Sequence, residues 1–312
     1  MQDAHETISR LRREIGRAVI GQQAVVDRLV IAILIRGHVL VEGLPGLAKT
    51  LLVKTLATSI DATFKRIQFT PDLLPADITG TQVFNPESRT FAPRLGPIFA
   101  NFVLADEINR APAKVQSALL EAMQERQVTI GDATYALPDP FVVIATQNPI
   151  EHEGTYALPE AQVDRFVMKL NVAYPAPDEE LRMLSLYLDP TIARVEVNRV
   201  VALDEIAKVA GLAAQVHMDE KIGRYIVQIV TATRKPTPHV AFGASPRATL
   251  ALAHVAKAHA FMEGRAFVIP EDVKGVAHDV LRHRLVLSYE AAADQMSADR
   301  IVDQVLAGVQ VP

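Results

Sequence analysis

Residues 43–50 are the stretch of this chain whose spacing most directly suggests chemistry. They read Gly-Leu-Pro-Gly-Leu-Ala-Lys-Thr, after the apolar run 38–42 and before an apolar helical pattern. A glycine-bearing turn between a strand and a helix can direct backbone N–H groups at phosphates. We therefore expect Lys49 to reach the β- and γ-phosphates of a nucleotide and the Thr50 hydroxyl to bind Mg²⁺. The candidate cofactor-binding residues of this stretch are Gly43, Pro45, Gly46, Leu47, Ala48, Lys49, Thr50 and Leu51.

One position departs from the usual G-x-x-x-x-G-K-[S/T] pattern, because Ala48 stands where the last glycine is expected. We expect residue 48 to lie already in the following helix, where alanine has no steric cost. The alternative for the whole stretch is an ordinary strand–turn–helix connection with a surface lysine.

Two adjacent carboxylates, Asp106 and Glu107, end the apolar run that begins at Phe102. Ligands of a parallel sheet bind beyond the carboxyl ends of its strands, so we expect both side chains near the phosphate loop. Asp106 can then hold Mg²⁺ through its water shell, and Glu107 can orient and deprotonate an attacking water. The alternative is a solvated strand end.

Asn148 follows the predicted strand 141–146, where it can contact the γ-phosphate and the attacking water. Its alternative is a turn residue, since Asn-Pro favours turns. Arg165 precedes the predicted strand 166–172 and can stabilise transition-state charge at a neighbouring γ-phosphate. Its alternative is a salt bridge with Asp164 or Glu160.

Arg247 opens a predicted helix in the run Gly-Ala-Ser-Pro-Arg, from where it can reach phosphates across an interdomain cleft. Its alternative is an exposed arginine in a first helical turn. The helix dipole disfavours a cation at that position, which favours a functional reason for it.

The elements that must position these residues alternate along the chain. Apolar runs at 38–42, 64–69, 102–106, 141–146 and 166–172 are separated by helical patterns, and helices are also expected at 7–18 and on to Arg36. Such alternation predicts an α/β fold with a parallel five-stranded sheet covered on both faces.

Two segments interrupt this alternation. Residues 70–98 are interrupted by Pro71, Pro75, Gly80, Pro86, Pro93 and Pro97 and predict an insertion in which 80–84 pairs with 90–93. Residues 127–137 predict a second hairpin around Gly131-Asp132.

Beyond residue 177 helical periodicity dominates, which predicts an α/β core over 1–177 and a helical lid domain over 178–312. The helices expected in the lid span 178–188, 203–216, 219–234, 246–263, 270–282 and 297–308.

Composition limits the class of protein. The chain has 312 residues, is 49% hydrophobic and carries a net charge of −4 without a polybasic run, which argues against sequence-independent nucleic-acid binding. It has no cysteine, hence no disulfide framework or thiolate metal site, and its nine histidines show no ligand spacing. The longest apolar run, 29–35, is too short to span a bilayer, and we expect a cytoplasmic protein.

The order of these motifs resembles the AAA+ ATPases, and long stretches resemble their MoxR family. The family-like runs are 105–112, 121–125, 145–149, 153–156 and 158–166, and the resemblance extends from residue 19 to the C-terminus. It implies that 70–98 is a helix-2 insert and that 127–137 is a pre-sensor-1 hairpin. It implies these residue roles: Lys49 and Thr50 in Walker A, Asp106 and Glu107 in Walker B, Asn148 as sensor 1, Arg165 as arginine finger, Arg247 as sensor 2, and Val19, Ile20 and Gly21 beside adenine.

The same resemblance leaves open whether Arg247 acts in its own subunit or a neighbour's, and it makes Arg110 a second candidate for an inter-subunit arginine. It implies a homo-oligomer, as a hexameric ring, that uses ATP and Mg²⁺ to remodel or mature protein complexes. Metal or cofactor insertion, a partner with a von Willebrand factor A (VWA) domain and a protein client belong to that expectation.

Three alternatives differ in class. The first is a nucleic-acid-dependent motor or loader of the same clade, and the others are a GTP-dependent switch and a non-hydrolysing structural module. The chain has no Asn-Lys-x-Asp run for guanine recognition, and it carries both carboxylates and both arginines.

Overall fold

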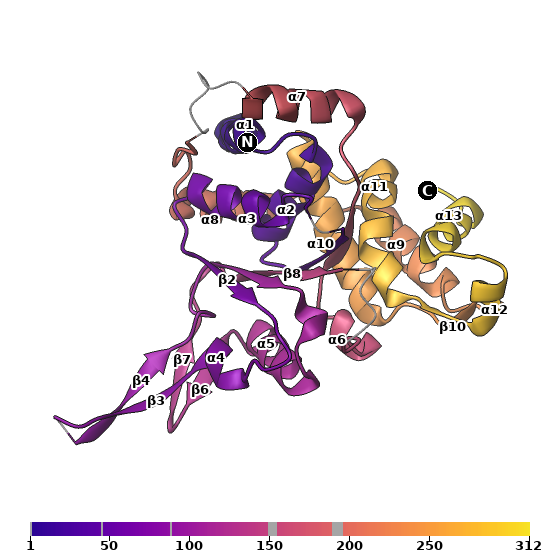
Figure 1. Ribbon diagram of the computed structural model, residues 1–312. Helices are drawn as coiled ribbons and strands as arrows, with labels where there is room; N and C mark the ends of the chain where they lie inside the picture. The colour runs from indigo at the N-terminus through magenta and orange to yellow at the C-terminus, as the bar shows by residue number, and fades with distance from the viewer. Residues whose placement is uncertain (1, 45, 88, 149–154, 189–195) are drawn as a thin grey trace.

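A parallel five-stranded sheet forms the centre of the computed structural model, which describes residues 2–44, 46–87, 89–148, 155–188 and 196–312 (Figure 1). The strand order is β2-β5-β8-β1-β9, and neighbouring strands run parallel. The predicted sheet is therefore confirmed, with strand ends within two residues of the expected ones. The strands are β2 (Phe64–Gln68), β5 (Phe102–Asp106), β8 (Val142–Gln147), β1 (Val39–Gly43) and β9 (Met168–Val172).

Apolar side chains cover both faces of the sheet because successive residues of a strand point to opposite sides. Val39 and Val41 of β1 belong to one buried cluster, while Leu40 between them belongs to the other. Helices α1, α2 and α3 pack on the first face, and α5 packs on the second, as Figure 1 shows. These helices span Gln2–Ala18 (α1), Gln23–Leu34 (α2), Lys49–Ser59 (α3) and Ala113–Glu125 (α5).

The first helix begins five residues earlier than the sequence analysis expected, at Gln2 instead of residue 7. The added turn is mostly polar, so it lacks the apolar spacing on which that prediction depended. Ala4 in this turn is nevertheless buried in the core cluster, which explains why the helix extends there.

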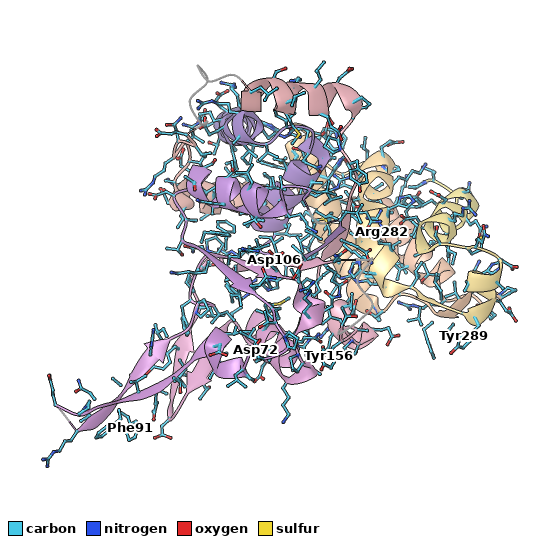
Figure 2. All side chains as sticks on the ribbon, viewed as in Figure 1. Asp72, Phe91, Asp106, Tyr156, Arg282 and Tyr289 are labelled. Atoms are coloured by element: carbon cyan, nitrogen blue, oxygen red, sulfur yellow. The ribbon has the colours of Figure 1, made fainter. Side chains whose placement is uncertain are left out.

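Two antiparallel hairpins project from the second face of the sheet, and both were predicted (Figure 1). Strands β3 (Gly80–Asn85) and β4 (Thr90–Leu95) form the longer one, after the short helix α4 (Pro75–Thr79). Strands β6 (Gln127–Ile130) and β7 (Ala133–Ala136) form the other. The exposed rings of Phe84 and Phe91 pair across the long hairpin in a tilted arrangement, with centroids 5.3 Å apart, and Figure 2 shows Phe91 far from the body of the protein.

The C-terminal part is helical, as predicted. Helix α8 packs on α2, and its residue Glu205 forms a 2.9 Å ion pair with Arg10 of α1. The helices of this part are α7 (Pro177–Leu188), α8 (Leu203–Ala214), α9 (Glu220–Ala232), α10 (Pro246–Met262), α11 (Pro270–Leu281), α12 (Tyr289–Ala293) and α13 (Ala298–Gly308).

The structure contains a small antiparallel sheet that was not predicted, formed by β10 (Val240–Phe242) and β11 (Val286–Leu287). Strands of three and two residues are too short to produce a recognisable alternation of polar and apolar side chains. Helix α12 was missed for the same reason of length.

Candidate functional site

The phosphate-loop candidate connects β1 to the N-terminus of α3, as the sequence predicted. Gly43 passes close to β9, since a Cβ there would lie 3.0 Å from the Val172 Cβ. Gly46 has a φ of +86°, a left-handed conformation that glycine adopts without steric cost. Pro45 lies outside the described residues. The backbone of the turn thus requires the glycines that the motif supplies.

Our expectation for Ala48 is wrong. Residue 48 is the N-cap of α3, with φ of 53° and ψ of 22°, and so it lies in the left-handed region and not within the helix. A side chain in this region places its Cβ too close to the following carbonyl oxygen. The glycine of the usual pattern would avoid that cost at this position.

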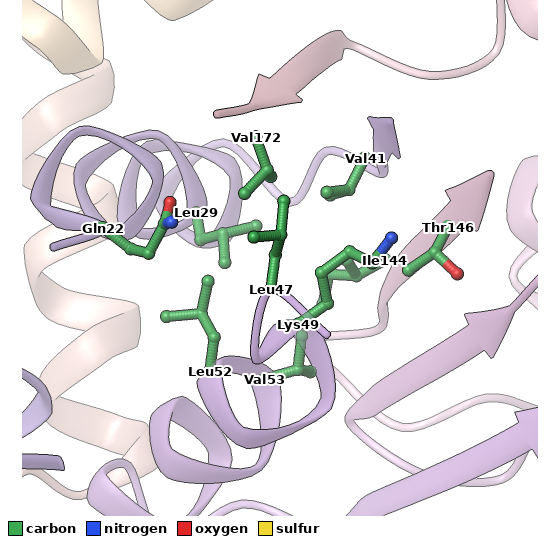
Figure 3. A pocket seen from close by; sticks show the side chains of 10 residues that line it. All are labelled: Gln22, Leu29, Val41, Leu47, Lys49, Leu52, Val53, Ile144, Thr146 and Val172. Atoms are coloured by element: carbon green, nitrogen blue, oxygen red, sulfur yellow. The ribbon is translucent and has the colours of Figure 1, made fainter. Parts of the chain in front are cut away.

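A small apolar space lies under the turn, and Leu47 points into it (Figure 3). Its volume of about 10 Å³ is close to the minimum that one water needs. Lys49 lies beside it, and its ammonium donates a 2.6 Å hydrogen bond to the Gly43 carbonyl. Burial lowers the pKa of Lys49, while the charges of Asp106 and Glu107 oppose that shift. The space is lined by Gln22, Leu29, Val41, Leu47, Lys49, Leu52, Val53, Ile144, Thr146 and Val172.

A larger cavity of about 360 Å³ lies above the turn, at the carboxyl ends of β1, β5 and β8. It brings together Lys49 and Thr50 with Asp106, Glu107 and Asn148, which are far apart in the sequence. Parallel strands end at one edge of a sheet, and this explains the convergence. Leu47 and Ala48 also line the cavity, as do Gly46, Arg66, Thr146 and Gln147.

Hydrogen bonds engage both oxygens of the Asp106 carboxylate. The Thr146 hydroxyl donates to Oδ1 at 2.6 Å, and Arg66 donates to Oδ2 from Nη2 at 2.6 Å and from Nε at 3.0 Å. Figure 2 shows Asp106 at the edge of the sheet, near the middle of the molecule. Arg66 and Thr146 were not among the predicted site residues. Arg66 could have been found from the sequence, because Arg66 and Gln68 are polar residues at alternate positions of a predicted strand and so lie on one face of it.

Glu107 has a strained backbone and a restrained side chain. Its φ of 57° and ψ of 50° are left-handed, and its N–H donates to the Thr146 hydroxyl at 2.9 Å. Non-glycine residues in this region cost about 1–3 kcal/mol and cluster at functional sites. Gln68 donates to Glu107 Oε2 at 2.7 Å, and Arg110 forms an ion pair with the same oxygen at 3.2 Å. Arg110, the second candidate for an inter-subunit arginine, is thus paired within its own chain.

The donor set of this cavity fits a nucleotide with Mg²⁺. Lys49 and Arg66 supply positive charge for phosphates, and the first N–H groups of α3 point toward the same space. Thr50 and Asp106 offer the oxygen ligands that Mg²⁺ prefers. Among the described residues no three His, Asp or Glu side chains converge as a metal site.

Arg165 and Arg247 lie in a second cavity of about 160 Å³, away from the phosphate-loop candidate. Its other lining residues are His38, Met123, Gln124 and Asp164. The Arg165 guanidinium donates to the Leu120 carbonyl at 2.7 Å, whereas Asp164 forms its ion pair with Arg284. The alternative of a salt bridge between Arg165 and Asp164 is therefore wrong, because Asp164 pairs with Arg284 and Arg165 binds a backbone carbonyl.

The predicted adenine-side residues lie in the connection between α1 and α2. Val19 is buried in the core cluster, and Gly21 has a φ of +77° with Glu179 beside it. Gln22, the next residue, reaches the small space under the phosphate-loop candidate. Neither described cavity beside Lys49 is lined by Val19, Ile20, Gly21 or Leu51, so these four assignments stay predictions.

Comparisons with known proteins agree with this geometry. Residues 38–168 match the ATPase family associated with various cellular activities (AAA), and residues 235–305 match the AAA lid domain. Among the described residues, none of the helices has a stretch long and apolar enough to cross a lipid bilayer.

Full-length relatives show similar extents. Chaperone MoxR1 of Mycobacterium tuberculosis is 49% identical over 98% of this chain and 82% of that protein. Protein MoxR of Methylorubrum extorquens is 31% identical over 96% of this chain and 94% of its own length. A crystal structure of a protein from Cytophaga hutchinsonii, inferred to be an ATPase, has a TM-score of 0.93 and 46% identity, covering 100% of this chain and 96% of that one.

Proposed function

Because the chain belongs to the MoxR family of AAA+ ATPases, we propose that it binds ATP with Mg²⁺ and hydrolyses the nucleotide beside Glu107. The observation that supports this proposal is the 360 Å³ cavity in which Lys49, Asp106, Glu107 and Asn148 converge from separate elements. A phosphate-binding lysine, a metal-binding carboxylate and a base beside one space are the parts that phosphoryl transfer to water requires.

Each residue then has a distinct task. Lys49 and the N-terminal N–H groups of α3 bind the phosphates, and Thr50 and Asp106 hold Mg²⁺. Bound Mg²⁺ would neutralise charge on the phosphates. Glu107 accepts a proton from the attacking water, which Asn148 helps to orient. Gln68 and Arg110 hold the Glu107 carboxylate in place before the reaction begins.

We extend the proposal to a ring in which neighbouring subunits complete each other's sites. Arg165 and Arg247 line one cavity together, and that cavity is distinct from the one that contains Lys49. An arginine pair on a subunit's own surface is suited to the phosphates of an adjacent subunit. Both arginines would therefore act in trans, in a homo-oligomer that we propose to be a hexamer.

Two substitutions test the proposed chemistry. Lys49→Ala should abolish ATP binding, since the cavity loses its phosphate-binding ammonium. Glu107→Gln should retain binding but lose roughly 10²–10⁴-fold in turnover, the range for a lost general base. Glu121→Gln, on the exposed face of α5, is the matched control and should keep the wild-type rate. A Glu107→Gln protein with the full ATPase rate would refute the assignment of the base.

Mixed rings test the trans arrangement. Arg165→Ala should nearly silence turnover, because an arginine in this role contributes roughly 10³–10⁵ in rate. Lys49→Ala subunits cannot hydrolyse ATP but still carry Arg165, so mixing the two variants should restore part of the activity. No restoration, under conditions where mixed rings are shown to form, would rule out the trans model.

The biological role that we propose is chaperone-like maturation of protein complexes, in the cytoplasm, with a VWA-domain partner and a protein client. One relative is named a chaperone, and the family resemblance supplies the rest of this proposal. Glu107→Gln protein should trap the ATP-bound complex, so a reproducible protein partner should co-purify from the native host. ATPase activity that DNA stimulates, with a steep salt dependence, would favour the motor alternative instead.

A further inference from the structure

The lid contacts the open edge of the central sheet through a short turn, η2 (Arg282–Arg284). Strand β9 is at that edge, and an edge strand has unpaired carbonyl groups. The Arg282 guanidinium donates to the Lys169 carbonyl at 2.7 Å, and His283 Nε2 donates to the Phe166 carbonyl at 3.0 Å. Figure 2 shows Arg282 where the lid meets the core. The turn therefore ties the lid to the segment that begins with Arg165.

Arg284 is the most buried member of this turn, with 3% of its side chain exposed. It donates to Asp164 Oδ1 at 2.7 Å, to the Phe166 carbonyl at 2.7 Å and to the Val280 carbonyl. Burial lowers the pKa of Arg284, and the Asp164 carboxylate opposes that shift. A cation so buried requires a close anionic partner, and Asp164 is that partner.

Asp164 also contacts the helix that carries Arg247. Its second oxygen, Oδ2, accepts a 2.9 Å hydrogen bond from the Ser245 hydroxyl. Ser245 is the N-cap of α10, and its Oγ accepts from the N–H of Arg247 at 3.2 Å. Asp164 thus precedes Arg165 in the chain and is hydrogen-bonded to Ser245, the N-cap of the helix that carries Arg247.

Asp164 lines the same 160 Å³ cavity as Arg165 and Arg247. In that cavity a carboxylate without other partners would be the strongest attraction for either guanidinium, at the expense of an incoming phosphate. Arg284 and Ser245 instead occupy both oxygens of Asp164. Arg165 donates to a neutral carbonyl, that of Leu120, a weaker partner that a phosphate can displace.

We propose that Arg284 is a positioning residue that holds the Asp164 carboxylate away from Arg165 and Arg247, so that both arginines stay available to a nucleotide phosphate of the adjacent subunit. This inference rests on the proposed trans role of the two arginines. The lid would thereby control, through η2, whether Arg165 and Arg247 can bind a phosphate. Arg284 itself would not contact the nucleotide.

A double substitution distinguishes this role from a merely structural one. Arg284→Met removes the partner of Asp164 Oδ1, so we expect turnover to fall by roughly tenfold or more, up to the roughly 10³–10⁵-fold that loss of an arginine finger costs. Nucleotide affinity of the subunit's own site, measured with a fluorescent ATP analogue, should not change. Adding Asp164→Asn to Arg284→Met removes the competing charge and should restore much of the turnover. A double variant that recovers no turnover, or that recovers turnover only in step with the free energy of unfolding, would overturn the proposal, because neutralising a buried unpaired carboxylate also restores stability.

Mixed rings separate this inference from the underlying trans model. Arg284→Met subunits should be rescued by Lys49→Ala subunits, as Arg165→Ala subunits should be. If the Arg165→Ala mixture recovers activity and the Arg284→Met mixture does not, the role of Arg284 is refuted while the trans model stands. If neither recovers, the trans model itself fails, and this inference fails with it.

A milder variant covers the case in which Arg284→Met does not fold. Ser245→Ala removes one hydrogen bond to Asp164 and also the N-cap of α10. Ser297→Ala removes the N-cap of α13, where the Ser297 Oγ accepts a 3.2 Å hydrogen bond from the Arg300 N–H. Both variants should lose the stability that one helix cap contributes. We expect only Ser245→Ala to lower turnover, by several-fold. Equal turnover in the two variants would count against the proposal.

Discussion

Ala48 shows how one residue can carry a backbone strain that its sequence pattern hides. It caps α3 in the left-handed region, beside the lysine that we assign to phosphate binding. Glu107, which lines the same cavity, is left-handed as well. Two strained residues thus line the candidate site, as is common where the surrounding fold imposes a functional geometry.

We expect Ala48→Gly to raise the free energy of unfolding by up to about 1 kcal/mol. The Cβ penalty in the left-handed region is roughly 1–2 kcal/mol, and the greater flexibility of glycine in the unfolded chain offsets part of the gain. Urea unfolding followed by circular dichroism measures the change. Ala207→Gly, at an exposed position in α8, is the matched control and should lose about 0.5–1 kcal/mol. Equal losses in both variants would contradict the assigned conformation.

His38 is a buried histidine that the fold keeps neutral. Its Nε2–H donates to the Met123 carbonyl at 3.1 Å, and its Nδ1 accepts from the Val143 N–H at 3.0 Å. Burial lowers the pKa of His38 to about 4, with a further contribution from Arg126, while the bond to Met123 opposes the shift. This residue immediately precedes β1 and borders the cavity of Arg165 and Arg247, so its protonation state bears on stability near that site.

The free energy of unfolding should therefore fall as the pH drops from 6.5 to about 4. In this range His38 is protonated in the unfolded chain but stays neutral in the folded chain. At about 1.36 kcal/mol per pKa unit, the loss from His38 is about 3 kcal/mol across this window. Urea unfolding of wild type and His38→Gln at a series of pH values isolates the effect. The variant should show a shallower pH dependence, and parallel profiles would contradict the prediction.

At the scale of elements, glycines have opposite roles in the lid helices and in the projecting hairpin. A Cβ at Gly211, inside α8, would have no neighbour within 4 Å. A Cβ at Gly80, at the base of β3 with a φ of +99°, would lie 2.3 Å from the Arg94 carbonyl oxygen. The hairpin base thus depends on glycine, while the helix is only weakened by it.

Gly211→Ala should accordingly raise the free energy of unfolding by about 1 kcal/mol, the usual difference in helix propensity. Gly80→Ala should lower it and disturb the pairing of β3 with β4, because neither the backbone angle nor the space accepts a side chain. Thermal unfolding of the two variants against wild type measures both changes. A Gly80→Ala protein as stable as the wild type would show that the hairpin base can rearrange.

At the scale of the whole molecule, one buried cluster joins the core to the lid. It includes Ile8 and Leu29 from the N-terminal helices, Leu170 from the sheet, and Leu252 and Val280 from the lid helices. The ion pair between Arg28 of α2 and Asp279 of α11, at 2.7 Å, adds to this contact. The predicted boundary at residue 177 therefore separates two regions of the sequence that share a hydrophobic core.

We expect calorimetry of the nucleotide-free subunit to show a single unfolding transition, since neither region can lose its packing without exposing the shared cluster. An Arg28→Ala substitution should lower the midpoint of that transition as a whole. Two separate endotherms, of which only one responds to Arg28→Ala, would show that the core and the lid unfold independently.

Local sequence patterns were enough to predict the alternation of strands and helices, the two hairpins, the phosphate-loop candidate and the paired carboxylates. Each of these features depends on local periodicity or on residues that are adjacent along the chain. The tertiary structure decided which distant residues meet: Arg66 and Thr146 on Asp106, Gln68 on Glu107, and Arg284 on Asp164. Strand order and lid packing create those contacts, and no local pattern encodes them. The left-handed backbone of Ala48 also depends on how the turn fits between β1 and α3, so the motif alone misplaced it.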